Sequence, residues 1–463
     1  MAAPKEQNLL VKFAPNAYEQ MQTLVTTLSS QGGKAELLGN SWVHVQVSGK
    51  RAALTLAALN AEPSVEFVQP NYKIKLLENY QIQDPLRRAA LARSLKKQGY
   101  VPEAIVDNPA IPDAPNQGAG SDPLFSKQWG MNDIGVKKAW EKTMGSPDMI
   151  VAVIDTGIDY THEDLIPNLW RNSKEIPNNG IDDDGNGYID DVIGWDFASN
   201  DNKPFDLSVD PYQLLMGGGN PGHGTHCSGN VAAKGGNALG IAGVAPNVKI
   251  MGLRFITEKG EGTTADAIKA IKYAVDNGAK VLSNSWGSEG EDPAEGTENK
   301  ALRDVITYAQ DHNVLFVAAA GNGHKGVGYD NDTDKAPGFP ASYDNENIIS
   351  VAALDVDNKL GPFSNWGAKT VDIGAPGVNV FSTMVGNKYS DKVFSIGGYE
   401  VSWDGTSMAT PHVAGAAALY WSAYPNKNWK DVKDALISTA KKIPAMSGKS
   451  VSEGKLDVEA LLH

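Results

Sequence analysis

The chain has 463 residues, of which 41% are hydrophobic, and it carries a formal net charge of -14 at pH 7. This length exceeds what one small domain needs and allows a large core plus a further unit. The negative charge argues against nucleic acid as a partner, and no apolar run reaches the roughly 18 residues that a membrane span requires. The single cysteine excludes an intrachain disulfide, so packing and bound metal ions would have to supply stability outside a cell.

The first 77 residues have the pattern of a small α+β unit. Apolar alternation and helical spacing predict the order strand, helix, strand, helix, strand, at residues 9–13, 17–28, 42–47, 51–59 and 65–72. The preceding Met1–Gln7 lacks the apolar segment of a secretory signal peptide. We therefore expect either an intracellular protein or one whose signal has been removed, and the presence of this N-terminal unit favours the second.

Residues 78–122 differ in character from both neighbouring regions. A basic stretch comes first, in which leucine and alanine are interleaved with Arg87, Arg88, Arg93, Lys96 and Lys97. Residues 108–122 come next and are rich in proline, glycine and aspartate without periodicity. We predict a linker, with the basic stretch either as a solvated helix or docked on the acidic remainder of the chain.

Residues 123–463 alternate short apolar strands with amphipathic helices. The predicted strands are 150–154, 249–253, 280–283, 314–319, 348–352 and 371–374. A helix at 264–277 stops at Gly278, as expected of a helix C-terminus. This alternation predicts an α/β fold with a parallel sheet covered by helices on both faces, and a binding crevice beyond the carboxyl ends of its strands.

Three segments of this region carry a serine, a histidine and an aspartate. Ser407 stands between the turn at Gly405 and an alanine-rich helix, which is where a nucleophile would sit. A serine hydroxyl needs a base and an orienting acid to become nucleophilic. Asp155 follows an apolar strand, and His223 lies in the run Gly-His-Gly-Thr-His. The order Asp, His, Ser along the chain is that of subtilisin.

With these motifs in this order, residues 123–463 resemble the subtilases, the subtilisin-like serine peptidases. The resemblance implies a serine endopeptidase that acts on protein or peptide substrates through an acyl-enzyme, with Asp155, His223 and Ser407 as its triad. It also implies an oxyanion asparagine, Asn322, at the end of an apolar run. Two alternatives stay open: a serine-carboxyl peptidase, which uses a glutamate base, and a binding or folding scaffold with an inert site.

A metal site near the histidine is another alternative. His223, His226 and Cys227 fall within five positions, which could suggest zinc. The spacing lacks the His-Glu-x-x-His pattern of metallopeptidases. We expect His226 and Cys227 to be helix residues packed behind the site.

The resemblance extends to the N-terminal unit. It implies that residues 1–77 form an inhibitory propeptide domain, ferredoxin-like in fold, which assists folding and leaves its tail in the cleft. An unrelated ferredoxin-like accessory domain is the alternative. The expected protein is then a secreted zymogen that processes itself in the linker, because exposed linkers are the preferred places for proteolytic nicking.

Substrate binding by backbone edges is also implied. Subtilases add an extended peptide as a strand, and the matching segments here begin at Gly260 and Ser285. The implied substrate-binding residues are Gly260, Gly262, Ser285, Trp286, Gly287, Ala319, Ala320 and Gly321. The small residues among them suggest a first pocket that admits large apolar side chains, although Trp286 could equally belong to the core.

Two loops are candidate calcium sites. The first resembles the subtilase calcium loop, which implies as ligands Asp164, Gly235, Asn237, Leu239 and Ile241, with Gln128 as a further candidate. The second matches the early part of an EF-hand loop, with ligands at Asp182, Asp184, Asn186, Tyr188 and Asp190. Its twelfth position is Ile193 instead of glutamate, so Asp191 or a residue outside the loop would have to substitute. The alternative is an acidic solvated loop.

Overall fold

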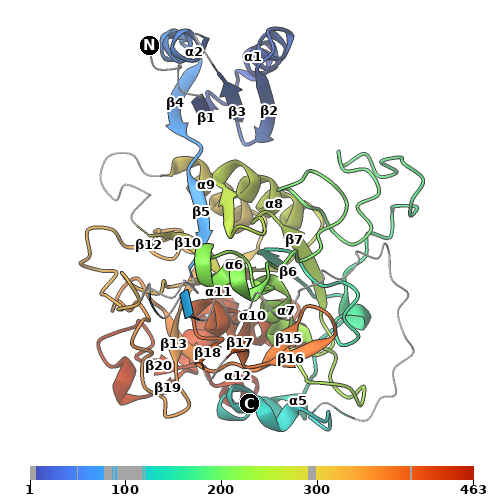
Figure 1. Cartoon of the computed structure of the whole chain (residues 1–463), viewed down its shortest axis with the longest axis vertical. Helices are drawn as coiled ribbons and strands as arrows, with labels where there is room; N and C mark the ends of the chain where they lie inside the picture. The colour runs from blue at the N-terminus through green and yellow to red at the C-terminus, as the bar shows by residue number, and fades with distance from the viewer. Residues whose placement is uncertain are drawn as a thin grey trace.

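The computed structural model describes residues 7–48, 51–77, 86, 89–90, 118, 120–289, 299–396 and 399–463. Most of the predicted linker, including nearly all of the basic stretch, lies outside the described residues. Figure 1 shows a small N-terminal unit standing above a larger body that holds the remaining elements. Among the described residues, no helix is both long and apolar enough to cross a bilayer.

The larger body is built on an eight-stranded sheet. In spatial order its strands are β19 (Lys441–Lys442), β20 (Gly454–Lys455), β14 (Ile373–Pro376), β13 (Ile348–Leu354), β11 (Leu315–Ala319), β9 (Val281–Asn284), β6 (Ile150–Asp155) and β7 (Lys249–Arg254). All neighbours pair in parallel except β19, which runs antiparallel to β20. The six predicted strands are therefore confirmed, with small shifts at their ends.

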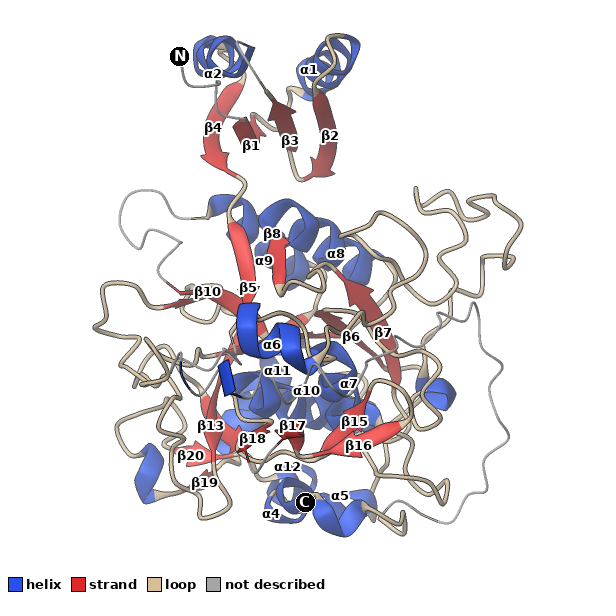
Figure 2. Cartoon of the chain, in the orientation of Figure 1, coloured by secondary structure: helices blue, strands red, loops and turns tan. Residues whose placement is uncertain are grey.

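Side chains of the central strands alternate between two cores on opposite faces of the sheet. On β6, Val151 and Val153 join one core, whereas Ala152 and Ile154 join the other. The helices that complete these cores are α7 (His223–Ala232) and α10 (Thr406–Ala423) for the first, and α8 (Thr264–Asp276) and α9 (Lys300–Asp311) for the second. Figure 2 shows helices on both sides of the strands. A strand buried on both faces is continuously apolar, which confirms the predicted covered sheet.

The N-terminal unit is a four-stranded antiparallel sheet with two helices. Its elements are β1 (Gln7–Phe13), α1 (Tyr18–Ser30), β2 (Lys34–Gly39), β3 (Trp42–Val47), α2 (Arg51–Ala61) and β4 (Val65–Pro70). The succession βαββαβ with sheet order β2-β3-β1-β4 is ferredoxin-like. The sequence prediction omitted β2, because this edge strand buries only one of its six residues and shows no apolar alternation.

The remaining elements are short and lie around the main sheet. The helical ones are η1 (Phe125–Lys127), α4 (Trp129–Asp133), α5 (Val136–Trp140), η2 (Ile166–Asn168), α6 (Pro211–Gly217), α11 (Trp429–Ser438), η3 (Pro444–Met446) and α12 (Val458–Leu462). The strands are β5 (Lys73–Leu76), β8 (Glu261–Thr263), β10 (Trp286–Glu289), β12 (Gly338–Phe339), β15 (Ser382–Met384), β16 (Lys388–Ser390), β17 (Lys392–Ile396) and β18 (Tyr399–Ser402).

The N-terminal unit rests on helices α8 and α9 of the larger body. Asp304 of α9 accepts hydrogen bonds from Lys12 Nζ at 2.7 Å and from Trp42 Nε1 at 2.9 Å. Lys269 of α8 lies 3.2 Å from the carboxylate of Glu36. From this unit, β5 descends into the larger body, as Figure 1 shows, and becomes a strand of a second sheet with order β12-β10-β5-β8.

Candidate active site

The aspartate and histidine of the predicted triad are in direct contact. Asp155 ends β6 and His223 begins α7, and both side chains are fully buried. His223 Nδ1 lies 2.8 Å from Asp155 Oδ1, which also accepts a hydrogen bond from the Thr156 backbone N–H at 2.7 Å. This contact orients the ring with Nδ1 toward the carboxylate, so Nε2 is the nitrogen available for proton transfer.

Ser407 stands in the first turn of α10 and is held next to this pair. Its Oγ donates a hydrogen bond to the Ser285 carbonyl at 3.0 Å, and Ser285 Oγ donates to the Ser407 carbonyl at 2.9 Å. Cys227 Sγ lies 3.8 Å from His223 Nδ1 and 3.6 Å from the Ser407 carbonyl oxygen. The three segments predicted to carry catalysis, far apart in sequence, are thus brought together at the starts of α7 and α10.

Asn322 follows β11 and is joined to the residue that precedes the serine. Its Oδ1 accepts hydrogen bonds from the backbone N–H of Thr406 at 2.8 Å and from Thr406 Oγ1 at 2.9 Å. Because both partners present protons, the oxygen end of the amide is the one fixed on Thr406. The NH₂ group is therefore the end that can donate to a ligand beside Ser407.

A buried carboxylate that the sequence prediction missed links the segments of Asp155 and His223. Asp206 accepts from Thr156 Oγ1 at 2.8 Å, from Asn220 Nδ2 at 2.6 Å, and from Thr225 N and Oγ1 at 2.8 Å and 2.6 Å. Burial raises its pKa to about 6. In the sequence, only the position of Asp206 within the long interval between Asp155 and His223 could have suggested this role. Asp206 positions the helix that carries His223.

The side chain of His226 is engaged elsewhere, which argues against a zinc site formed by His223, His226 and Cys227. Its Nε2 lies 3.0 Å from the Val380 carbonyl, and its ring stacks on Trp403 at 4.2 Å between centroids. Burial lowers its pKa. Burial also raises the pKa of the Cys227 thiol, so the thiol stays neutral behind His223.

Acid should destabilise the protein through a further buried histidine, His412 of α10. Burial lowers its pKa to about 4, below the unfolded value of about 6.5. The unfolded chain therefore binds a proton first, and stability present above pH 6.5 is lost as the pH falls toward 4, by about 3 kcal/mol. We expect the unfolding free energy of His412→Gln to fall less over this range than that of wild type. The exposed His312→Gln serves as control, and parallel profiles for all three proteins would contradict the prediction.

The predicted substrate segments flank a strand of the chain itself. β5 runs antiparallel to β8 on one side and to β10 on the other, with Ile74 opposite Gly262 and Lys75 opposite Gly287. The Leu76 N–H donates to the Gly260 carbonyl at 3.1 Å. The two predicted edges therefore hold an extended segment between them.

Trp286 contributes its backbone to this sheet and its side chain to the core. The indole is fully buried, donates to the Ile154 carbonyl at 2.8 Å, and packs edge-on against Phe255. The structure therefore supports the alternative that the Trp286 side chain belongs to the core. The predicted pocket residues Ala319, Ala320 and Gly321 lead from β11 into Asn322, and the two alanines are buried.

Two buried carboxylates, Asp122 and Asp164, lie against the first candidate calcium loop, where the sequence predicted one. Asp164 accepts from Asn237 Nδ2 at 2.7 Å and from the Ile241 N–H at 2.8 Å. Asp122 accepts from the N–H groups of Gly236 and Asn237 at 2.9 Å and 3.2 Å. Burial raises the pKa of Asp122, and it raises that of Asp164 to about 6. Two desolvated carboxylates that come from separate segments and face the same loop are a donor set that fits a calcium ion.

Gln128 was predicted as a further ligand at the first loop, but its side-chain amide binds the backbone of Ala242. Its Nε2 donates to the Ala242 carbonyl at 3.0 Å and its Oε1 accepts from the Ala242 N–H at 3.1 Å. Both ends of the amide are thus engaged with one backbone unit. Gly235 and Leu239 lie on the same loop as Asn237, whose Oδ1 accepts from the Leu239 N–H at 3.0 Å. Position 122 falls at the end of the predicted linker, which is why the sequence prediction omits its acid.

In the second loop, the structure gathers Asp182 and Asp184 with Glu175, with their carboxylate oxygens within 4.8 Å of one another. Glu175 precedes the loop, and its carboxylate accepts hydrogen bonds from the backbone N–H groups of Asp183, Asp184 and Asp190 at 2.9 Å, 3.2 Å and 3.1 Å. Asp190 of the predicted set is not part of this group: its carboxylate accepts from the N–H groups of Asn179 at 3.0 Å and Gly180 at 2.9 Å.

The remaining predicted ligands of the second loop are Asn186, Tyr188 and Asp191, and they contact one another or residues outside the loop. Asn186 Nδ2 donates to Asp191 Oδ2 at 2.9 Å, and Asn186 Oδ1 accepts from the Tyr188 N–H at 2.8 Å. Asp191 also accepts from the Tyr273 hydroxyl, which ties the loop to α8. The ring of Tyr188 packs edge-on against Tyr273 at 5.1 Å. Asp191 thus has a structural role that does not require metal.

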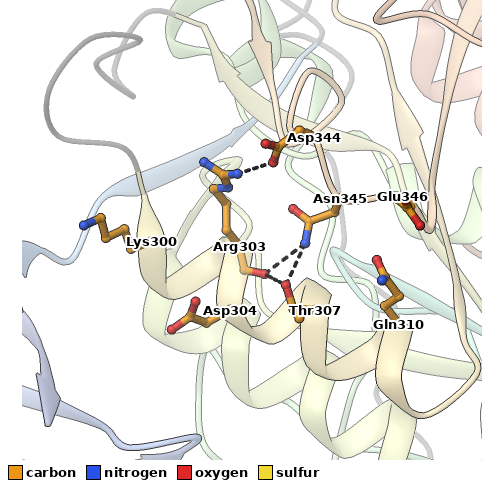
Figure 3. A pocket seen from close by; sticks show the side chains of 8 residues that line it. All are labelled: Lys300, Arg303, Asp304, Thr307, Gln310, Asp344, Asn345 and Glu346. Carbon is orange, nitrogen blue, oxygen red and sulfur yellow. Dashed lines mark hydrogen bonds and ion pairs between the residues drawn. The ribbon is translucent and has the colours of Figure 1, made fainter. Parts of the chain in front are cut away.

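A polar hollow of about 450 Å³ lies on the outer side of α9, apart from these segments. Figure 3 shows Arg303 directed at Asp344, and Asn345 directed at the Arg303 carbonyl and Thr307 Oγ1. None of the triad segments lines this hollow. Arg303 and Asp344 form an ion pair in this hollow, whereas Asp304 is paired with Lys12 of the N-terminal unit.

Known proteins identify the family to which this geometry belongs. The model of the family described as "Subtilase family" matches residues 146–455. The chain belongs to the subtilase family. This subtilase is 37% identical over 68% of its length to the thermophilic serine proteinase of Bacillus sp. (strain AK1). It is 35% identical over 70% of its length to thermitase of Thermoactinomyces vulgaris.

A solved structure supports the same assignment. Fervidolysin of Fervidobacterium pennivorans, described as a keratinolytic enzyme related to subtilisin, matches the whole of this subtilase with a TM-score of 0.68 and 26% identity. The matches cover 62% of the Bacillus proteinase, 61% of the fervidolysin chain and 92% of thermitase. The structure also favours a histidine base over the glutamate base of the serine-carboxyl alternative, because it is His223 that contacts Asp155.

Proposed function

We propose that this subtilase is a serine endopeptidase that hydrolyses peptide bonds with Ser407 as nucleophile and His223 as base. The observation that carries the proposal is the buried contact of 2.8 Å between His223 Nδ1 and Asp155 Oδ1, with Ser407 fixed at the adjoining helix start. Ser407 Oγ attacks the substrate carbonyl after its proton turns from the Ser285 carbonyl to His223 Nε2. Asp155 remains ionised and stabilises the imidazolium.

The oxyanion of the tetrahedral intermediate requires donors placed before the reaction begins. The Asn322 NH₂ group and the Ser407 backbone N–H are the donors that we assign to it. His223 then delivers its proton to the leaving amine, and the ester of Ser407 is hydrolysed by water in a second round of the same steps. Helix α10 adds the positive end of its dipole at Ser407.

A covalent probe tests this proposal directly. A fluorophosphonate reacts with an activated serine hydroxyl, so after incubation with calcium it should modify Ser407 alone, as located by peptide mass mapping. Asp155→Asn should slow labelling by a factor on the order of 10⁴, because the imidazole is then held in the wrong tautomer. Heat-unfolded protein is the control. Labelling of several serines at equal rates, or of none, would refute the assignment.

We infer that residues 1–77 act as an intramolecular inhibitor of a zymogen. β5 takes the two edges that would otherwise hold substrate, and the unit behind it is anchored on Asp304 and Lys269 of the catalytic domain, 123–463. Removal of this unit by self-cleavage in or before the linker, residues 78–122, would free the edges. A curated relative from Natrialba magadii, 31% identical, is named an extracellular serine protease; we propose secretion for this chain as well.

We further propose that calcium ions stabilise the catalytic domain at both loops. Asp122, Asp164 and oxygens of the loop around Asn237 would hold one ion, and Glu175, Asp182 and Asp184 the other. A bound ion would offset the repulsion and desolvation of these carboxylates. It supplies stability to the fold, and the chemical steps are those of the chain's own side chains.

Chelation is therefore expected to lower the melting temperature by several degrees, because the ions bind the folded state preferentially. Asp164→Asn should melt lower in calcium and lose part of its response to chelator, since one carboxylate ligand is gone. The exposed Asp148→Asn should behave as wild type. Calorimetric scans with calcium and with excess chelator measure both effects, and a melting temperature that does not move in any of the proteins would remove the calcium proposal.

A further inference from the structure

Strand β5 ends beside the nucleophile, and its pairing sets which residue arrives there. Leu76 lies opposite Trp286 and Lys75 opposite Gly287 in an antiparallel register. One further step along both strands sets Leu77 opposite Ser285. The Ser285 carbonyl is the group that accepts the hydrogen bond of Ser407 Oγ at 3.0 Å. The backbone of Leu77 is thus the part of the strand that reaches the serine.

Residues 73–77 contain two buried side chains, Ile74 and Leu77, which we call the anchors. Exposed Lys75 and half-buried Leu76 lie between them. Ile74 is 2% exposed and Leu77 is 9% exposed, whereas Lys73 and Lys75 point to solvent. Leu77 Cδ2 lies 3.3 Å from where a Cβ on Gly287 would stand, so the Leu77 side chain packs closely over the backbone of β10 at this glycine. The pocket at Ile74 is formed by β10, Leu302 and Phe339.

The register is locked because both one-residue slips are costly. A slip in one direction would place Lys73 in the buried position of Ile74, and a slip in the other would place Lys75 there. Either would bury an ammonium group in an apolar pocket without a partner, which costs several kcal/mol. The Leu76 N–H bond to the Gly260 carbonyl, at 3.1 Å, further fixes the alignment.

Resting on the serine endopeptidase function proposed above, we propose that the chain's own first cleavage site is the peptide bond that follows Leu77, read by Leu77 and Ile74. Ser407 Oγ adds to the Leu77 carbonyl carbon and gives its proton to His223. The bond to the next nitrogen breaks as that proton passes to the leaving amine. One water then hydrolyses the Leu77 ester, which leaves a carboxylate on Leu77 and restores the serine.

The fragments formed earliest locate the bond. Full-length protein, purified in calcium and sampled from the first minutes, should yield a fragment whose C-terminal residue is Leu77, by intact mass and by sequencing of the new N-terminus. A first cut elsewhere overturns this inference but leaves the endopeptidase standing. Absence of any cut, with hydrolysis of added casein intact, also overturns it. Absence of both activities refutes the proposed function itself.

Matched variants test whether the side chain of Leu77 determines where the chain is cleaved, or whether exposure of the peptide bond is sufficient. Leu77→Asp should slow this cleavage by at least about tenfold, because it would place a carboxylate where the leucine side chain is buried. Lys75→Asp, which puts the same side chain two residues earlier on the solvent side, should change the rate less than about threefold. Equal slowing by both variants, or by neither, would contradict the reading by Leu77.

A peptide assay avoids any dependence on the folding of the variants. The mature wild-type enzyme should cleave a peptide of sequence Lys-Ile-Lys-Leu-Leu with a C-terminal reporter amide at the reporter bond. Aspartate in place of the last leucine or of the isoleucine should lower kcat/KM by about tenfold or more, and aspartate in place of the second lysine by much less. Indifference to all three changes would overturn the assignment of the anchors.

Discussion

Ser407→Ala is expected to lower kcat for peptide hydrolysis by a factor on the order of 10⁶, the size of the loss seen when the serine of a subtilisin triad is removed. The reason is that the whole chemical sequence passes through Oγ, which no other group near His223 can replace; the adjacent Cys227 thiol is held neutral by burial, which raises its pKa. Self-cleavage should stop for the same reason.

The fold should survive this change. Ser407 Oγ makes one hydrogen bond to the Ser285 carbonyl, and the loss of such a bond costs about 1 kcal/mol. Ser422→Ala is a matched control, because Ser422 lies on the same helix and its Oγ donates to the Ala418 carbonyl at 2.7 Å. Casein hydrolysis, intact mass and thermal melts compare the three proteins. A Ser407→Ala protein that digests casein or shortens itself normally would remove Ser407 as nucleophile.

Asn322→Ala should reduce kcat by a factor of about 10² to 10³ with little change in KM, because its NH₂ group donates to an oxyanion that exists only in the transition state. The variant also leaves the Thr406 N–H without the Oδ1 that accepts from it at 2.8 Å. A loss of stability is therefore expected alongside the loss of rate, on the order of 1 to 3 kcal/mol.

Asn322→Asp separates the two effects. A carboxylate still accepts from Thr406, so melting should stay closer to wild type than in the alanine variant. It offers no donor and brings a negative charge toward the oxyanion, so kcat should fall at least as far as with alanine. Steady-state kinetics on a synthetic peptide and thermal melts measure both. Wild-type kcat in either variant would exclude Asn322 from the oxyanion site.

The residues proposed for catalysis could be named from the sequence because each carries a local signal. Asp155 ends an apolar strand, His223 and Ser407 begin helices after glycine, and these turns depend on neighbours in sequence. The main strands were predictable for the same reason, since burial on both faces leaves continuous apolar runs that end in polar residues. Periodicity and turn chemistry are local properties, and they are visible without a structure.

The groups gathered at the two candidate calcium loops could be predicted only in part, because distant segments contribute them. Asp122 meets Asn237 across more than a hundred residues, and Glu175 approaches Asp182 and Asp184 from outside their loop. Asp190 fits the loop pattern, yet its carboxylate binds the backbone at Asn179 and Gly180. Which way such a side chain turns depends on the fold around it, and a spacing pattern does not contain that information.

The sequence by itself determined the family, the order of the triad and the covered parallel sheet, because these depend on short motifs and on the burial of alternating side chains. Tertiary structure alone decided that the Trp286 side chain belongs to the core, that Asp206 links the Asp155 and His223 segments, and that Leu76 of β5 pairs with Trp286. Each of these depends on strand register and on packing between segments distant along the chain. A shift of one residue in β5 would leave every local motif unchanged while it altered which bond meets the serine.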